Sequence, residues 1–222
     1  MAQSILNPIL SRWLKDRPDL VAKVDCDVCT LAGARPAERE RWAKYKCCTF
    51  QPYVSCFAAG AMLSAGIDPL RVDRQRAVLL PIGVVASDQF RTKLLAIPDG
   101  QRGEEQLCTY FNRELRRCGI WQFRPGECSV YFCAEPGKAE RDLLSKNAFA
   151  LEAAVAQMAL VHLGYSPEFV AEQVDLLNGP GVTPQELSPT EAYRLYRATW
   201  EWASQLSSGE VLSWLDSEPE AL

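Results

Sequence analysis

Apolar residues recur at helical spacing through the last third of the chain. Between residues 139 and 163 they fall three or four positions apart, and this pattern predicts one long helix that ends at Gly164. A Ser-Pro pair begins a second predicted helix over 166–177. Ser188 and Glu191 have the spacing of a capping box, in which each side chain accepts a hydrogen bond from the other residue's backbone, and they predict a third helix.

The middle of the chain has shorter apolar runs. Small residues over 57–66 predict a helix with Ser55 as its N-cap and Gly66 at its end. Two apolar runs, 76–85 and 91–98, flank the polar tetrapeptide SDQF and predict the two strands of a β-hairpin. The predicted fold class is therefore α+β, mainly helical, with a small β-hairpin and an irregular cysteine-rich region.

The N-terminal quarter of the chain has a less regular pattern. Short helices are predicted over 4–14 and 36–46, and residues 47–56 are expected to be irregular. No internal repeat or low-complexity segment divides the sequence. We therefore expect a single domain over 1–222, in which residues 138–222 form a helical C-terminal part.

Composition and charge narrow the classes of function. Hydrophobic residues make up 48% of the chain and charged residues 23%, which is typical of a globular protein. The net charge of −4 gives no general attraction for nucleic acid or for an anionic membrane, so neither is expected as a partner. The longest apolar run, 77–86, is too short to cross a bilayer. The N-terminal residues do not have a signal-peptide pattern, and a cytoplasmic location is expected.

Nine cysteines are the main candidates for chemistry. A cytoplasmic location disfavours stable disulfides, so metal ligation is the leading interpretation, and buried, inert thiols are the alternative. Eight are candidate metal ligands: Cys26, Cys29, Cys47, Cys48, Cys108, Cys118, Cys128 and Cys133. The ninth, Cys56, lies beside the small-residue helix and is expected to pack as a buried small hydrophobe.

The spacing of the cysteines indicates how they would share a metal. Cys26 and Cys29 form a C-x2-C pair, whose tight turn lets two thiolates converge on one ion. Cys47 and Cys48 are adjacent, and neighbouring side chains in extended backbone point to opposite sides. The sequence leaves open which of these two binds, and whether the cysteines build one centre or two. A soft, all-thiolate donor set favours zinc or an iron–sulfur cluster over hard cations.

The stretch LCTYFNRELRRCGIWQFRPGECSVYFC resembles the YkgJ-type cysteine-cluster proteins, which are described as zinc- or iron-chelating. The matching elements, in order, are Cys108 with Tyr110, Cys118 with Ile120, Arg124-Pro125, Cys128 and Cys133. In the family's first half a Cys-Cys pair follows the C-x2-C almost at once, whereas here seventeen residues intervene. The resemblance covers residues 24–134 and implies a metal-binding part there.

Residues around the cysteines bear on the identity of the metal. Aromatic side chains such as Tyr53, Tyr110 and Phe123 crowd the cysteines, and a dry aromatic shell protects an iron–sulfur cluster. Neither the usual ferredoxin spacing nor the paired C-x2-C of zinc ribbons is present. An iron–sulfur cluster, most of all a 4Fe-4S cluster, is therefore favoured over zinc as the cofactor.

Positive charge and glycines beside the cysteines fit such a centre. Four thiolates around zinc or a cluster leave a net negative charge, which Arg124 is placed in sequence to balance from the second shell. The alternative is that Arg124-Pro125 forms a turn, with Arg124 solvated or paired to an acid. Gly119 and Gly126 would let backbone amides approach the sulfur atoms closely.

The remaining motifs leave the activity open. His162, the one histidine, lies on the apolar stripe of its predicted helix and is expected to be a buried core residue. No nucleotide-binding loop or hydrolase motif is present. Three functions are open. The chain is a metal-binding protein for redox chemistry or metal handling, or a zinc-stabilised scaffold that presents Trp200 and Trp202 to a protein partner. The third is an enzyme similar to the cysteine-cluster lysine methylases. For the two tryptophans, ordinary core packing is favoured.

Overall fold

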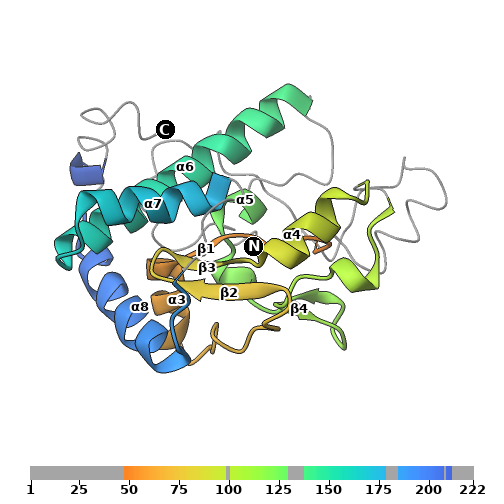
Figure 1. The fold of residues 1–222 in the computed structure, drawn as a ribbon, viewed down its shortest axis with the longest axis horizontal. Helices are drawn as coiled ribbons and strands as arrows, with labels where there is room; N and C mark the ends of the chain where they lie inside the picture. The colour runs from red at the N-terminus through yellow and green to blue at the C-terminus, as the bar shows by residue number, and fades with distance from the viewer. Residues whose placement is uncertain (1–47, 99–100, 130–137, 179–184, 208, 212–222) are drawn as a thin grey trace, which may run out of the picture.

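The computed structural model describes residues 48–98, 101–129, 138–178, 185–207 and 209–211 (Figure 1). The helices predicted over 4–14 and 36–46 lie outside these residues.

The described part of the chain is an α+β fold with more helix than strand, as the sequence predicts. A three-stranded antiparallel sheet has the order β1-β3-β2, with β1 at Val54–Ser55, β2 at Ala77–Leu80 and β3 at Gly83–Ala86. A second, two-stranded sheet pairs β4 (Phe111–Asn112) with β5 (Arg117–Cys118). The helices are α3 (Cys56–Ser64), α4 (Asp88–Leu95), α5 (Gly126–Ser129), α6 (Lys138–His162), α7 (Pro167–Asn178) and α8 (Pro189–Ala203). Short 3-10 turns lie at Glu104–Gln106 and Trp121–Phe123.

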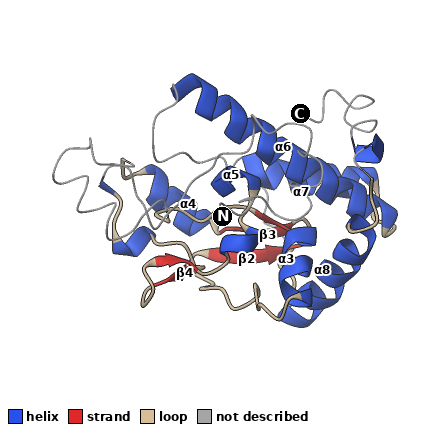
Figure 2. Ribbon diagram, turned by 180° about the vertical axis from the view of Figure 1, so that it is seen from behind, coloured by secondary structure: helices blue, strands red, loops and turns tan. Residues whose placement is uncertain are grey.

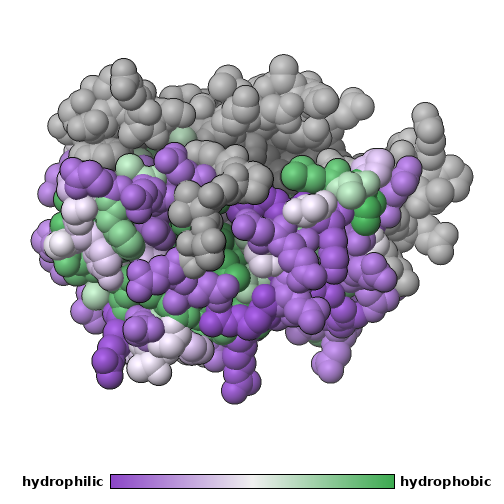
Figure 3. All heavy atoms as spheres, in the orientation of Figure 1, coloured by the Kyte–Doolittle hydropathy of each residue, from purple (hydrophilic) through white to green (hydrophobic). Residues whose placement is uncertain are grey.

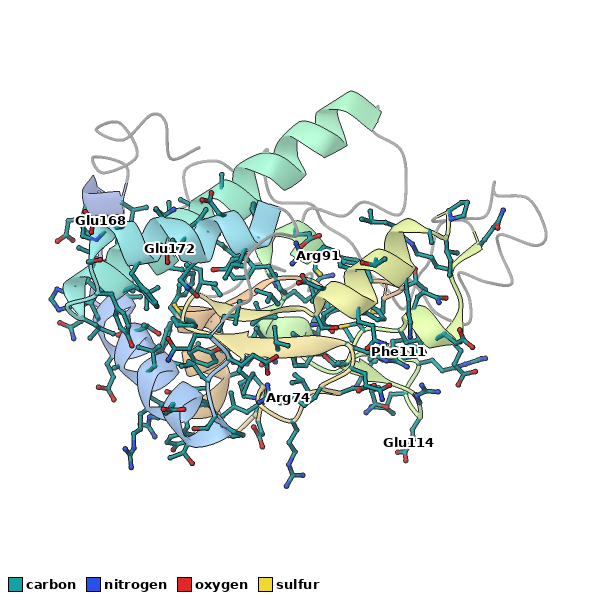
Figure 4. The ribbon with its side chains drawn as sticks, in the orientation of Figure 1. Arg74, Arg91, Phe111, Glu114, Glu168 and Glu172 are labelled. Atoms are coloured by element: carbon teal, nitrogen blue, oxygen red, sulfur yellow. The ribbon has the colours of Figure 1, made fainter. Side chains whose placement is uncertain are left out.

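The long helices gather on one side of the small sheet. Figures 1 and 2 show α6 and α7 running past β2 and β3, with β4 at the other end of the sheet. Arg91 of α4 donates a hydrogen bond to the Leu176 carbonyl at 3.1 Å, which ties α4 to α7 (Figure 4). On the face shown in Figure 3, hydrophilic residues cover much of the described surface, and apolar residues occupy smaller areas between them.

Helix α3 lies at the centre of the core. All its residues from Cys56 to Met62 are buried, and it packs most closely against α8. At Gly60 the two helices approach so closely that a Cβ atom would lie 1.9 Å from the Tyr196 carbonyl oxygen. The hydroxyl of the fully buried Tyr196 donates a hydrogen bond to the Leu80 carbonyl at 2.7 Å, which also joins α8 to β2.

The predicted hairpin is wrong in its second half. Both strands, β2 and β3, come from the first apolar run, and they pair so that Leu80 lies opposite Gly83. Pro81 is the reason, because a residue without an N–H cannot continue a ladder and favours a turn. Gly83 takes a φ of 148°, and a Cβ there would lie 2.2 Å from the Val54 carbonyl oxygen, so only glycine fits this tight return.

The second apolar run, 91–98, forms most of α4 instead of a strand. The polar residues before it begin this helix, because the Ser87 hydroxyl accepts the Phe90 N–H at 3.2 Å as an N-cap. In α4 only Phe90 is buried, so the apolar residues that suggested a strand lie largely at the surface.

Other predicted helix boundaries are confirmed. Ser55 is the N-cap residue of α3, although its side chain makes no capping hydrogen bond, and Gly66 takes a left-handed φ of 77° after its end. Gly164 follows α6 with a φ of 91°. The capping box of α8 is present, since the Glu191 N–H donates to the Ser188 hydroxyl at 3.3 Å and the Ser188 N–H donates to the Glu191 carboxylate at 2.8 Å.

None of the helices in the described part of the chain has the length and apolar character needed to span a bilayer.

The close approach of α3 and α8 predicts a strong effect of Gly60→Ala. The added methyl group must push the Tyr196 backbone away, which should lower the free energy of unfolding by about 1–3 kcal/mol or more. Urea denaturation measures this change. Gly209→Ala is the matched control, because no atom of the described residues lies within 4 Å of a Cβ at Gly209, and it should shift the midpoint little. Equal midpoints for the two variants would contradict the packing described here.

Candidate metal centre

Four of the candidate ligands lie among the described residues, namely Cys48, Cys108, Cys118 and Cys128. Cys26, Cys29, Cys47 and Cys133 lie outside them. Arg124, which is expected to balance the negative charge of the centre, also lies among the described residues.

The candidate ligands fall into two groups along the chain, Cys26 to Cys48 and Cys108 to Cys133. The backbones of Cys48 and Cys108 are in direct contact. The Cys108 N–H donates a hydrogen bond to the Cys48 carbonyl at 2.8 Å, although sixty positions separate the two residues. Cys48 is buried, and Cys108 is half-buried at the edge of the hydrophobic core. The end of the first cysteine group therefore lies directly against the start of the second.

Gln51 strengthens this junction. Its side chain is buried, and its carbonyl oxygen accepts hydrogen bonds from the Thr109 N–H at 3.0 Å and the Thr109 hydroxyl at 2.8 Å. The Gln51 side chain thus binds two polar groups of Thr109. Residues 48–51 and 108–109 are therefore joined by two sets of hydrogen bonds, one between Cys48 and Cys108 and one between Gln51 and Thr109.

A small β-ribbon brings Cys118 back toward Cys108. Cys118 in β5 lies opposite Phe111 in β4, and the Phe111 N–H donates to the Cys108 carbonyl at 3.0 Å. The Tyr110 N–H points to the Cys108 sulfur at 3.4 Å. An N–H···S hydrogen bond of this kind stabilises negative charge on a sulfur atom.

The N–H groups of Gly119 and Gly126 themselves donate to oxygen atoms. The Gly119 N–H donates to the Tyr110 carbonyl at 2.8 Å, and the Gly126 N–H donates to the Glu152 carboxyl at 2.9 Å. They are instead sites of close backbone packing, since a Cβ at Gly119 would lie 2.9 Å from the Tyr110 oxygen. An amide that reaches the Cys108 sulfur belongs to a bulky residue, Tyr110.

Cys128 is half-buried on α5, a single helical turn that packs against α6. Gly126 makes this packing close, because a Cβ there would lie 2.8 Å from the Ala148 Cβ. The 3-10 turn over Trp121–Phe123 precedes α5 and contacts α3. The position of Cys128 therefore depends on both α3 and α6.

Arg124 is buried rather than solvated. Only 2% of its surface is exposed, and its guanidinium carbon lies 3.5 Å from the centre of the Trp121 ring. A guanidinium stacked on an indole is stabilised by the negative face of the ring. A solvated Arg124 is therefore excluded. Arg116 and Arg117, which also precede a cysteine, are exposed.

Two carboxyl groups, those of Glu127 on α5 and Glu152 on α6, lie near each other. Burial raises the pKa of Glu127 to about 7, against a smaller lowering by a backbone hydrogen bond from Tyr53. Burial raises the pKa of Glu152 to about 8, and the nearby Glu127 raises it further, while the Gly126 N–H lowers it. Glu152 is fully buried on α6. At neutral pH its carboxyl group is therefore mainly protonated.

No group of three or more His, Cys, Asp or Glu side chains within the described residues is arranged to hold a metal ion. Cys56 is fully buried, and burial raises the pKa of its thiol to about 12, against a lowering by a hydrogen bond with Thr199. This agrees with its expected role as a packing residue.

The prediction that His162 is a core residue is wrong. Its side chain is exposed at the end of α6 and stacks on the Trp202 ring with 5.1 Å between ring centres. The helical stripe that contains it is buried at Leu151 and Val155, but the last turn extends past the core. Trp200 and Trp202 both pack partly against the core, as favoured from the sequence.

Sequence reasoning missed Glu152 and Gln51. A signal for Glu152 was available, because it lies between Ala148 and Val155 on the apolar stripe of α6, where a carboxyl group is unusual. Gln51 had no such signal, since its role depends on a segment far away in the sequence.

Comparisons of the chain with protein-family models, with curated proteins and with solved structures found no match.

The raised pKa of Glu152 predicts how stability changes with pH. The folded protein binds this proton more tightly than the unfolded chain, so between the ordinary value of 4.5 and about 8 the free energy of unfolding falls as pH rises. The slope contributed by one group is at most about 1.4 kcal/mol per pH unit.

Urea denaturation of the wild type and of Glu152→Gln at pH 5 and pH 8 measures this dependence. The variant should lose less stability between the two pH values, because its side chain does not titrate, while Glu127 remains in both proteins. The same loss in both proteins would show that the Glu152 carboxyl is not the group responsible.

Proposed function

We propose that this protein binds a metal centre through its cysteines, with an iron–sulfur cluster as the leading cofactor and zinc as the alternative. The observation that carries the proposal is the hydrogen bond from the Cys108 N–H to the Cys48 carbonyl. It joins Cys48, the last candidate ligand of the 26–48 group, to Cys108, the first of the 108–133 group.

The donor set supports a soft metal. Cys48, Cys108, Cys118 and Cys128 would contribute thiolates from the described residues. Cys26, Cys29, Cys47 and Cys133 would contribute the rest. Thiolate sulfur prefers zinc and iron–sulfur clusters to the hard cations that carboxylates bind.

The surroundings of Cys108 support the same proposal. Its sulfur accepts the Tyr110 N–H, and hydrogen bonds to sulfur are one of the means by which a protein tunes the potential of an iron–sulfur cluster. Tyr110 is itself buried, and its hydroxyl donates to the Pro69 carbonyl at 3.1 Å, so its backbone is held in place. The chain would bind and orient the centre, and a cluster would supply one-electron redox chemistry.

The irregular backbone around the cysteines favours zinc as the alternative. Residues 48–53 and 113–116 have no helix or strand, and β4 and β5 are two residues long each. A segment with so few regular hydrogen bonds gains folding energy from a structural metal. In this form the protein would be a scaffold for a protein partner.

Anaerobic purification followed by metal and sulfide analysis distinguishes the two forms. An iron–sulfur protein is expected to be brown, with broad visible absorbance and matching amounts of iron and acid-labile sulfide. A zinc protein is expected to be colourless with stoichiometric zinc. A well-folded protein that carries neither metal would overturn the proposed function.

Cys108→Ser and Cys118→Ser should each lose most of the bound metal, because a serine hydroxyl is a poor ligand for zinc or a cluster. Cys56→Ala is the matched control, since Cys56 is fully buried in the core and should lose stability without losing metal. Metal content per folded protein is the measurement. Loss of metal from Cys56→Ala alone would show that the ligands have been assigned to the wrong thiols.

A further inference from the structure

We propose that Glu152 is a positioning residue for the metal centre, since it holds the first turn of α5 in place and thereby sets the position of Cys128. The inference rests on the proposed function and extends it to a residue that is not itself a ligand.

The contact between Glu152 and α5 is direct. The Gly126 N–H, at the first residue of α5, donates a hydrogen bond to Glu152 Oε2 at 2.9 Å. The first N–H groups of a helix have no partner inside the helix, and in a single turn these groups are most of the backbone donors. Glu152 therefore supplies from α6 an acceptor that α5 cannot supply for itself.

A second contact fixes the same turn. A Cβ at Gly126 would lie 2.8 Å from the Ala148 Cβ and 2.9 Å from the Ala148 carbonyl oxygen. Ala148 and Glu152 are four residues apart, so they lie on the same face of α6 one turn from each other. The steric contact with Ala148 and the hydrogen bond to Glu152, one helical turn apart, together fix the position and the orientation of α5. Cys128 follows two residues after Gly126.

Core packing alone does not explain why a carboxyl group occupies this position. The side chain is fully buried, and its second oxygen, Oε1, has no hydrogen-bond partner among the described residues. A buried polar atom without a partner destabilises a fold by about 1–3 kcal/mol. An apolar side chain would avoid that cost but would leave the buried Gly126 N–H without this acceptor. The carboxyl group of Glu152 is accounted for if its hydrogen bond to α5 is needed to position Cys128.

Three substitutions separate positioning from stability. Glu152→Met removes the acceptor and keeps the volume of the side chain. Glu152→Gln keeps a carbonyl oxygen for the Gly126 N–H and, because the carboxyl is mainly protonated at neutral pH, resembles the native group closely. Leu160→Ala, at a fully buried position of the same helix, should destabilise the protein by about 2–5 kcal/mol without touching α5.

The expected result is a split between metal affinity and stability. Competition with a chelator should show metal held about 10-fold or more weakly in Glu152→Met, a loss typical of residues that orient ligands. Glu152→Gln should stay near the wild type, and Leu160→Ala should keep its metal affinity despite its lower stability. Hydrogen exchange should show a loss of protection centred on the Gly126 amide in Glu152→Met, whereas Leu160→Ala should lower protection throughout the core.

Glu152→Asp provides a milder test if the methionine variant folds poorly. It withdraws the carboxyl from Gly126 by one methylene, and it should give an intermediate loss of metal affinity.

The outcomes that overturn the proposals differ. Wild-type protein without metal overturns the proposed function. Wild-type protein with metal, together with equal chelator resistance in Glu152→Met and Glu152→Gln, overturns the positioning role alone.

Discussion

Helix α3 has no polar face, so other elements must cover it on every side. Helix α8 covers one side at the distance that Gly60 allows, β3 and α6 cover others, and the turn before α5 reaches it as well. The elements that carry the cysteines and the C-terminal helices are thus connected through one buried helix. Cys48 lies eight residues before the first residue of α3, so the core and the candidate centre share a boundary.

Local signals predicted the helices well, because their causes lie within a few residues. The capping box at Ser188 and Glu191, and the glycines after α3 and α6, act through backbone groups close by in sequence. The hairpin failed for a related reason. Two apolar runs of similar length look alike, and the prediction gave too little weight to Pro81, which divides the first run into two strands.

The candidate site was less accessible to sequence reasoning. Spacing pointed to two cysteine groups, but the contact between them depends on Gln51 and on one backbone hydrogen bond that no local pattern indicates. The prediction that His162 is buried failed because the apolar stripe of α6 continues into a turn that extends past the core. Glu152 could have been noticed as a carboxyl on that stripe, yet its link to Gly126 spans two helices and becomes visible only in three dimensions.

The burial of Cys56 has a consequence for how unfolding can be followed. A thiol reacts with alkylating reagents as the thiolate, and a pKa of about 12 leaves almost none of that form at neutral pH. Because the side chain has no exposed surface, the reagent can reach it only when α3 separates from its neighbours. The rate at which Cys56 is labelled would therefore report the opening of the core, as amide exchange does for a buried N–H, with one identifiable residue as the probe.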